Sequence, residues 1–143
     1  MSEINSKLRK VRLIQWALIA AVPIFAFVAE IGRSRGSSDW TWRHWLVAGL
    51  ALWAVSAGFQ IRHRLAHLSG KALTKDASNP KALRRWEVGQ IIGLAVAEAV
   101  AWWGLVVRMV LGGAFWQGSL FYAAALFLLL LWTPRTPITS ALI

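Results

Sequence analysis

The 143-residue sequence has no cysteine and few acidic residues. The absence of cysteine excludes several classes of chemistry. Without cysteine there is no disulfide, no thiol nucleophile and no thiolate ligand for an iron–sulfur cluster. Six acidic residues stand against sixteen lysines and arginines, which gives a formal net charge of +10. No phosphate-binding loop, serine nucleophile elbow or zinc signature occurs. The sequence therefore predicts no enzyme, no metal site and no cofactor.

Apolar residues are abundant instead: 57% of the chain is hydrophobic, above the roughly 45–50% of soluble domains. A helix crosses a bilayer with about 20 mostly apolar residues. Four stretches of that kind occur, at about 11–31, 44–61, 88–112 and 115–132. We therefore predict an all-α integral membrane protein, in which residues 1–143 form a single membrane domain with four transmembrane helices arranged as two hairpins.

The positive charges lie between the apolar runs, and this distribution predicts an orientation. They concentrate before residue 13 and in the long connection 62–87. Because cytoplasmic loops are enriched in Lys and Arg, we expect both termini and the basic loop 62–87 to be cytoplasmic, in a bacterial-type inner (plasma) membrane. Arg33, Arg35 and Arg43 of the first connection run against this bias. Nucleic acid is not an expected partner, because the charges do not form one soluble basic face.

The loop 62–87 is expected to contain helical turns beyond the membrane. The second helix should end near Ser69-Gly70, and the turn 77–80 should open the next helix at Lys81. Four arginines are candidates for docking anionic lipid or a cytoplasmic partner: Arg62, Arg64, Arg84 and Arg85.

Tryptophans are expected at both membrane interfaces. Trp40, Trp42, Trp45 and Trp116 would form the outer belt. The inner belt would contain Trp86 and Trp132.

Glu98 is an acid in the middle of the third apolar stretch. A charge at mid-bilayer depth costs roughly 2.5–3.5 kcal/mol on insertion scales, so an intramembrane acid points to function. In one interpretation it is an ion- or proton-binding carboxyl that exchanges with its surroundings. In the other it is a structural acid that hydrogen-bonds a neighbouring helix. Ser56 and Tyr122 lie at similar depth and are its candidate partners.

Arg108 is the nearest base along the same helix, but it does not suit Glu98. It lies about 15 Å further along the axis and about 80° around it. Glu30, at the outer end of the first span, lies at a depth comparable to that of Arg108. We predict a structural ion pair between Glu30 and Arg108.

Gly89, Gly93 and Ala97 form a small-residue series on a face beside Glu98. Such faces let helices approach closely. The series predicts helix packing, either within the chain or between copies of it.

The histidines do not form a cofactor site. His63 and His67 have the spacing of metal ligands on a helix, but no acid or cysteine completes a site. His44 and His63 stand at opposite ends of one helix, an arrangement that does not suit haem.

The segment 91–107, IIGLAVAEAVAWWGLVV, resembles the carboxylate-bearing helix of the rotor-ring c-type proteolipid subunits of rotary ATP synthases. As in that family, a basic stretch, here ending in Arg84 and Arg85, precedes the helix. The resemblance implies that Glu98 is an ion-carrying residue, within a ring of copies. It covers under twenty residues, and Arg108 on the same helix departs from the family pattern.

We expect a small non-enzymatic membrane subunit that assembles with itself, as a homo-oligomer, or with a larger membrane complex, and that carries a proton- or ion-exchanging carboxyl at Glu98. The alternative is a membrane anchor or scaffold in which Glu98 is structural and the basic loop docks a partner or anionic lipid. A small-molecule transporter is the weakest hypothesis, because only Glu98 and Arg108 are charged inside the membrane core.

Overall fold

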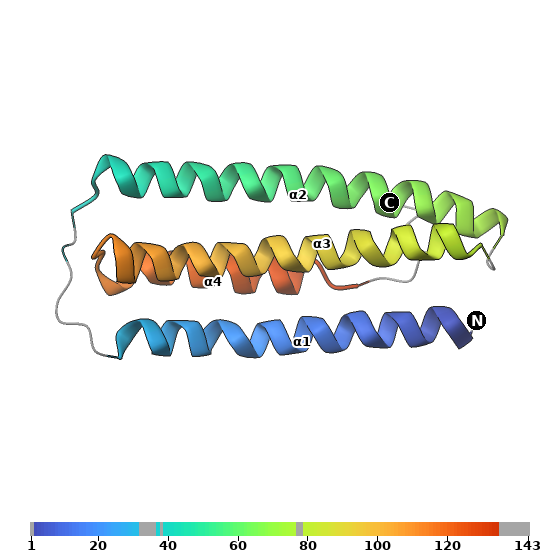
Figure 1. Ribbon diagram of the computed structural model, residues 1–143, viewed down its shortest axis with the longest axis horizontal. Helices are drawn as coiled ribbons and strands as arrows, with labels where there is room; N and C mark the ends of the chain where they lie inside the picture. Colours follow the sequence, from blue (N-terminus) through green and yellow to red (C-terminus); the bar gives the residue numbers. More distant parts are fainter. Residues whose placement is uncertain (1, 32–36, 38, 77–78, 135–143) are drawn as a thin grey trace.

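The computed structural model describes residues 2–31, 37, 39–76 and 79–134, and this part is almost entirely helical. The helices are α1 (Ser2–Glu30), α2 (Trp42–Lys75), α3 (Pro80–Leu105) and α4 (Phe115–Leu131), with a short π-helix, η1 (Val106–Val110), continuing α3 (Figure 1). The predicted all-α class is confirmed for these residues. Arg33, Arg35 and the C-terminus lie outside the described residues.

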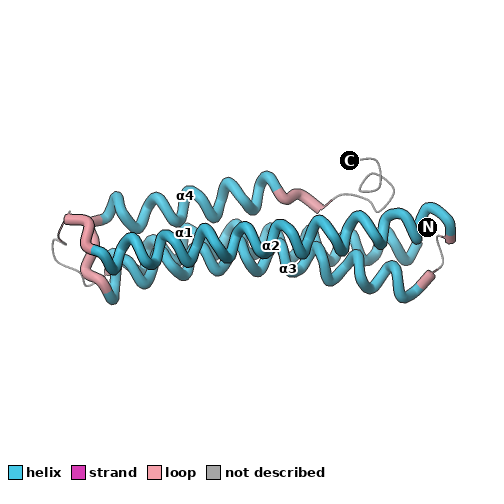
Figure 2. The backbone as a smooth tube through the Cα atoms, turned by 90° about the horizontal axis from the view of Figure 1, so that it is seen from above, coloured by secondary structure: helices cyan, strands magenta, loops and turns pink. Residues whose placement is uncertain are grey.

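α3 is the central helix of the bundle. It lies between α1 and α2 (Figure 1), and α4 packs on α3 and α1 from one side (Figure 2). α1 and α3 run in the same direction, whereas α2 and α4 run the opposite way. α1 packs chiefly on α3 and α4, and not on α2, which directly follows it in the sequence.

Three of these helices are long and apolar enough to cross a membrane: α1, α2, and α3 together with η1. α4 has 17 residues, which is about 25 Å at 1.5 Å per residue. That length is at the lower limit for a spanning helix. α2 is longer than a bilayer core requires, because its 34 residues reach about 51 Å against a hydrocarbon thickness of about 30 Å.

The segment 62–87 is not a loop, and the expected end of the second helix at Ser69-Gly70 is wrong. α2 continues to Lys75, and α3 already begins at Pro80. Asn79 caps α3, since its side-chain oxygen accepts hydrogen bonds from the backbone N–H groups of Lys81 and Ala82, both at 3.1 Å. Proline at the first helical position suits this start, because it has no N–H to leave unpaired.

Packing explains why the glycine does not stop α2. Ser69 and Gly70 are both buried, and α3 is the helix on which α2 chiefly packs. Beside them lies a small core, the inner cluster, formed by Leu8, Leu73, Ala82, Leu83 and Trp86. Tertiary burial outweighs the roughly 1 kcal/mol by which glycine disfavours a helix interior. The three helices therefore extend together beyond the apolar part of the bundle.

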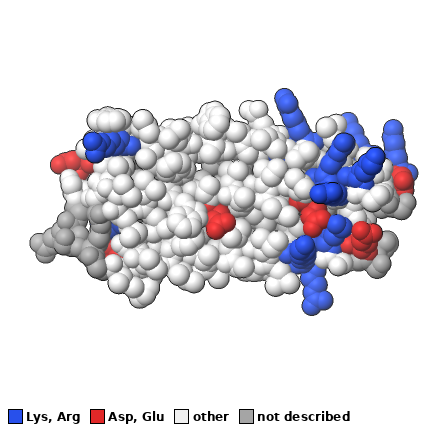
Figure 3. All heavy atoms as spheres, viewed as in Figure 1, with Lys and Arg blue, Asp and Glu red and all other residues white. Residues whose placement is uncertain are grey.

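We call this extension the basic end: residues 3–12 of α1, 62–75 of α2 and 80–87 of α3. Lys and Arg gather there and are nearly absent from the middle of the face in Figure 3. Trp86 is fully buried in the inner cluster, and Trp132 is also buried. The predicted inner tryptophan belt is therefore wrong for both residues. At the opposite end, Trp40 contacts Trp45 and Trp116, with ring centroids 5.0 and 5.9 Å apart.

Candidate functional site

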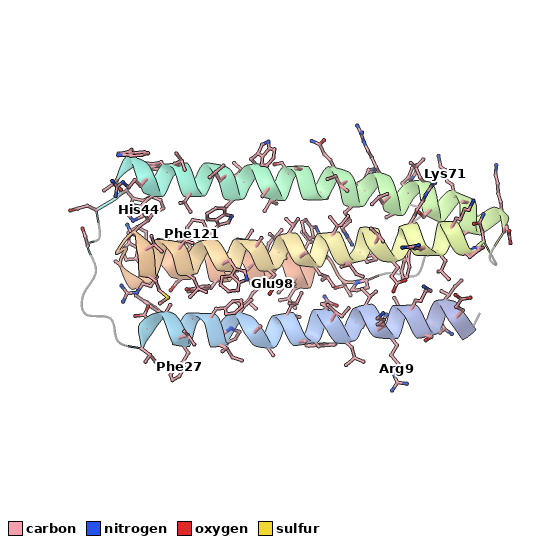
Figure 4. All side chains as sticks on the ribbon, in the orientation of Figure 1. Arg9, Phe27, His44, Lys71, Glu98 and Phe121 are labelled. Carbon is pink, nitrogen blue, oxygen red and sulfur yellow. The ribbon has the colours of Figure 1, made fainter. Side chains whose placement is uncertain are left out.

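Glu98 is the one charged residue of the apolar zone, which we define as residues 13–29, 46–61, 88–107 and 115–131. It lies on α3 between the basic end and Arg108. Figure 4 places it on the side of α3 that faces α1. In the same orientation, an acidic group reaches the surface in the middle of the uncharged section (Figure 3). Its side chain is partly buried.

The register between α1 and α3 identifies what lies opposite Glu98. Lys7 on α1 binds Glu87 on α3, and Glu30 binds Arg108, so paired positions differ by 80 and 78 residues. Glu98 is therefore level with the α1 segment 17–22, which reads ALIAAV. This segment has no polar side chain. The neighbouring helix thus provides no base to stabilise the ionised carboxylate.

Neither predicted partner reaches the carboxyl. Ser56 is on α2, on the other side of α3, and its hydroxyl donates to the carbonyl of Leu52 at 2.9 Å. Tyr122 packs its ring against Gly104, where an added Cβ would lie 2.7 Å from it. Gly104 is six residues, or about 9 Å, beyond Glu98. Within the described part of the chain, Glu98 has no hydrogen bond or ion pair.

Glu30 and Arg108 are brought together at the far end of the bundle. The Nε and Nη2 groups of Arg108 donate to the two carboxylate oxygens of Glu30 at 2.5 and 2.7 Å. The Nη1 group donates to the carbonyl of Gly113 at 2.6 Å. This two-pronged pair satisfies a buried arginine and joins the end of α1 to the connection between η1 and α4.

The π-helix explains how that connection closes. Gly113 donates its N–H to Val107 at 2.9 Å, and Gly112 has a φ of 72°, which glycine adopts without strain. Gln117 is buried and accepts from the N–H of Ala114 at 2.7 Å. Neither the π-helix nor the role of Gln117 was predicted, because no local signal distinguishes them from a simple turn.

The small residues on α3 pack within the chain. A Cβ on Gly89 would lie 3.0 Å from Leu65 of α2, and one on Gly93 would lie 2.6 Å from the side chain of Arg62. Ala97 is fully buried. The face of α3 that carries Gly89 and Gly93 is therefore covered by α2 of the same chain. A role in oligomer contact therefore has to come from another face.

The four docking arginines fall into two groups. Arg64, Arg84 and Arg85 are exposed at the basic end. Arg62 is partly buried, donates to Gln90 at 3.3 Å, and lies over the ring of Trp132, 5.5 Å from its centroid. Arg62 therefore joins α2, α3 and the end of α4.

Two of the histidines at the basic end, His63 and His67, stack on each other. The rings of His63 and His67 lie 5.8 Å apart and nearly parallel. In the part of the chain that the structure describes, no three potential metal ligands gather.

Compared with models of protein families, with curated proteins and with solved structures, the chain matches none.

Proposed function

We propose that this protein is a small non-enzymatic membrane subunit that assembles with itself or with a larger membrane complex, and that Glu98 is its proton- or ion-exchanging carboxyl. All four helices would span a bacterial-type inner membrane as two hairpins, with the basic end and both termini on the cytoplasmic side. The excess of Lys and Arg at that end supports this orientation.

One observation carries the proposal: Glu98 is partly exposed at mid-depth of the apolar zone and has no partner among the described residues. A lone ionised carboxylate facing lipid would cost several kcal/mol. The neutral acid, or a partner subunit covering it, removes that cost. Protonation and coverage by a partner are both consistent with a subunit whose Glu98 carboxyl changes its protonation when the group facing it changes.

Proton or ion exchange needs only one carboxyl that faces lipid at one time and a cation or water at another. Facing lipid, Glu98 holds a proton. Facing a cation or water in a partner, it releases the proton and becomes a carboxylate. The likeness of 91–107 to the rotor-ring helix supports this role. The position of the acid in the third helix and the presence of Arg108 argue against a rotor subunit itself.

Carbodiimide labelling tests the exchange directly. A hydrophobic carbodiimide reacts with a protonated carboxyl in an apolar setting, so we expect Glu98 to be modified in native membranes and labelling to fall as pH rises. Peptide mass spectrometry locates the adduct. The matched control is Glu3→Gln, which removes an exposed acid from the basic end and should leave labelling unchanged.

Two substitutions separate exchange from structure. We expect Glu98→Gln to preserve assembly, measured by native mass after gentle extraction, but to abolish pH-dependent labelling and any proton or ion flux. Labelling that stays constant across pH, together with a Glu98→Leu variant that dissociates a complex which Glu98→Gln leaves intact, would contradict exchange.

The alternative function is a membrane anchor. The observation that favours it is the inner cluster, which gives the basic end a hydrophobic core of its own outside the apolar zone. That end would present exposed arginines to a cytoplasmic partner or to anionic lipid. Under this alternative, neutralising Arg64, Arg84 and Arg85 releases the partner, whereas Glu98→Gln has no effect.

A further inference from the structure

A groove runs between α2 and α3 at the basic end, where the two helices leave the apolar zone. Its outer part, about 190 Å³, is lined by Ser69 and Ala72 of α2 and by Asn79, Lys81 and Arg85 of α3, among others. Its inner part, about 250 Å³, is lined by Leu65, Lys81, Arg84, Arg85 and Val88. Lys81 and Arg85 line both parts, so the two parts adjoin along one face of α3.

The groove changes character along its length. At the outer part, two basic side chains face the hydroxyl-bearing Ser69. At the inner part, Leu65 and Val88 provide apolar walls, and Val88 is the first residue of the apolar zone on α3. Spacing explains the alignment, because positions 81, 85 and 88 lie on one face of a helix. The groove therefore leads from a charged region into a hydrophobic one.

Ser69 gives the outer part a polar group that lacks a partner. Its residue is 2% exposed, and its hydroxyl makes no hydrogen bond in the structure. A buried hydroxyl without a partner normally costs about 1–3 kcal/mol, so rotation of the Ser69 side chain toward a ligand oxygen in the groove would remove that cost. The positive end of the α3 dipole adds to the potential of Lys81 and Arg85 there.

We propose that this groove binds one anionic phospholipid. The phosphate accepts hydrogen bonds from Lys81, Arg85 and the Ser69 hydroxyl, and an acyl chain passes Leu65 and Val88 into the bilayer. Basic pockets between helices at the cytoplasmic face hold acidic headgroups in this manner. The proposal rests on the anchor alternative, in which the basic end meets anionic lipid, and it does not depend on ion exchange at Glu98.

Native mass spectrometry of the full chain in detergent tests the site. Phosphatidylglycerol is titrated against the wild type and against Lys81→Gln/Arg85→Gln. We expect one tightly retained phosphatidylglycerol per chain and about thirtyfold weaker binding in the variant, since each of the two basic contacts contributes about fivefold. Ser69→Ala should weaken binding about threefold while raising thermal stability in lipid-free detergent, because it removes a buried hydroxyl that has no partner there.

The matched control is Lys71→Gln/Lys75→Gln, which removes the same charge from exposed positions of α2 outside the groove. We expect its affinity to stay within twofold of wild type. An equal loss in the control would overturn the proposal in favour of diffuse attraction. Equal retention of phosphatidylcholine, or displacement of the lipid by millimolar inorganic phosphate, would overturn it as well.

Discussion

At the scale of single residues, the two glutamates Glu30 and Glu98 differ in what compensates their charge. Glu30 receives two hydrogen bonds from the guanidinium of Arg108, which is itself 5% exposed. Glu98 has only apolar groups beside it on α1. A compensated acid stabilises a structure, whereas an uncompensated one is tolerated where its protonation can change.

We expect Arg108→Leu to destabilise the protein by about 3 kcal/mol, because it strands a carboxylate and the Gly113 carbonyl. Thermal unfolding in detergent measures the effect. Arg43→Leu is the control, since Arg43 is exposed at the same end of the bundle. Replacing both partners, Glu30→Leu/Arg108→Leu, should recover part of the loss. Equal stability of the Arg43 and Arg108 variants would show that the pair contributes nothing.

At the scale of helices, glycines set how closely neighbours approach. Gly104 of α3 accommodates the buried ring of Tyr122 on α4, whereas Gly49 of α2 has no atom within 4 Å of its would-be Cβ. The same substitution therefore has opposite consequences at the two positions.

We expect Gly104→Ala to destabilise by about 1–3 kcal/mol, because its methyl group would overlap the ring of Tyr122. Gly49→Ala should stabilise by up to about 1 kcal/mol, because alanine favours a helix and meets no neighbour. Thermal unfolding of both variants in one detergent gives the comparison. A stabilised Gly104→Ala protein would contradict the packing of α4 on α3.

The sequence predicted the helices and the Glu30–Arg108 pair, but it missed where α2 ends and which residues face Glu98. Apolar length predicted the helices, and matching depth predicted that Glu30 faces Arg108. Ser69-Gly70 misled the prediction, because the burial that keeps α2 helical comes from residues of α1 and α3 that are distant in sequence. The partners proposed for Glu98 failed for a related reason: depth can be read from sequence, but the face of α3 that meets each neighbour depends on the packed bundle.

At the scale of the whole molecule, charge asymmetry predicts which end faces the cytoplasm. The chain has no cysteine, so single cysteines report their location without background. Ser6→Cys lies at the basic end and Ser37→Cys at the opposite end, and both positions are exposed. We expect a membrane-impermeant maleimide to label Ser37→Cys in spheroplasts and Ser6→Cys only after lysis. The reverse pattern would invert the proposed topology.

The parallel pairing of α1 with α3 also governs how the protein is made. Arg108 lies 78 residues after Glu30, so at about 5–20 residues per second the ribosome adds it roughly 4 to 16 s later. If α1 enters the bilayer as proposed, it lacks its α3 and α4 contacts during that delay. α1 has the highest hydropathy of the three long candidate spans, and this allows the first helix to persist before its permanent neighbours have been translated.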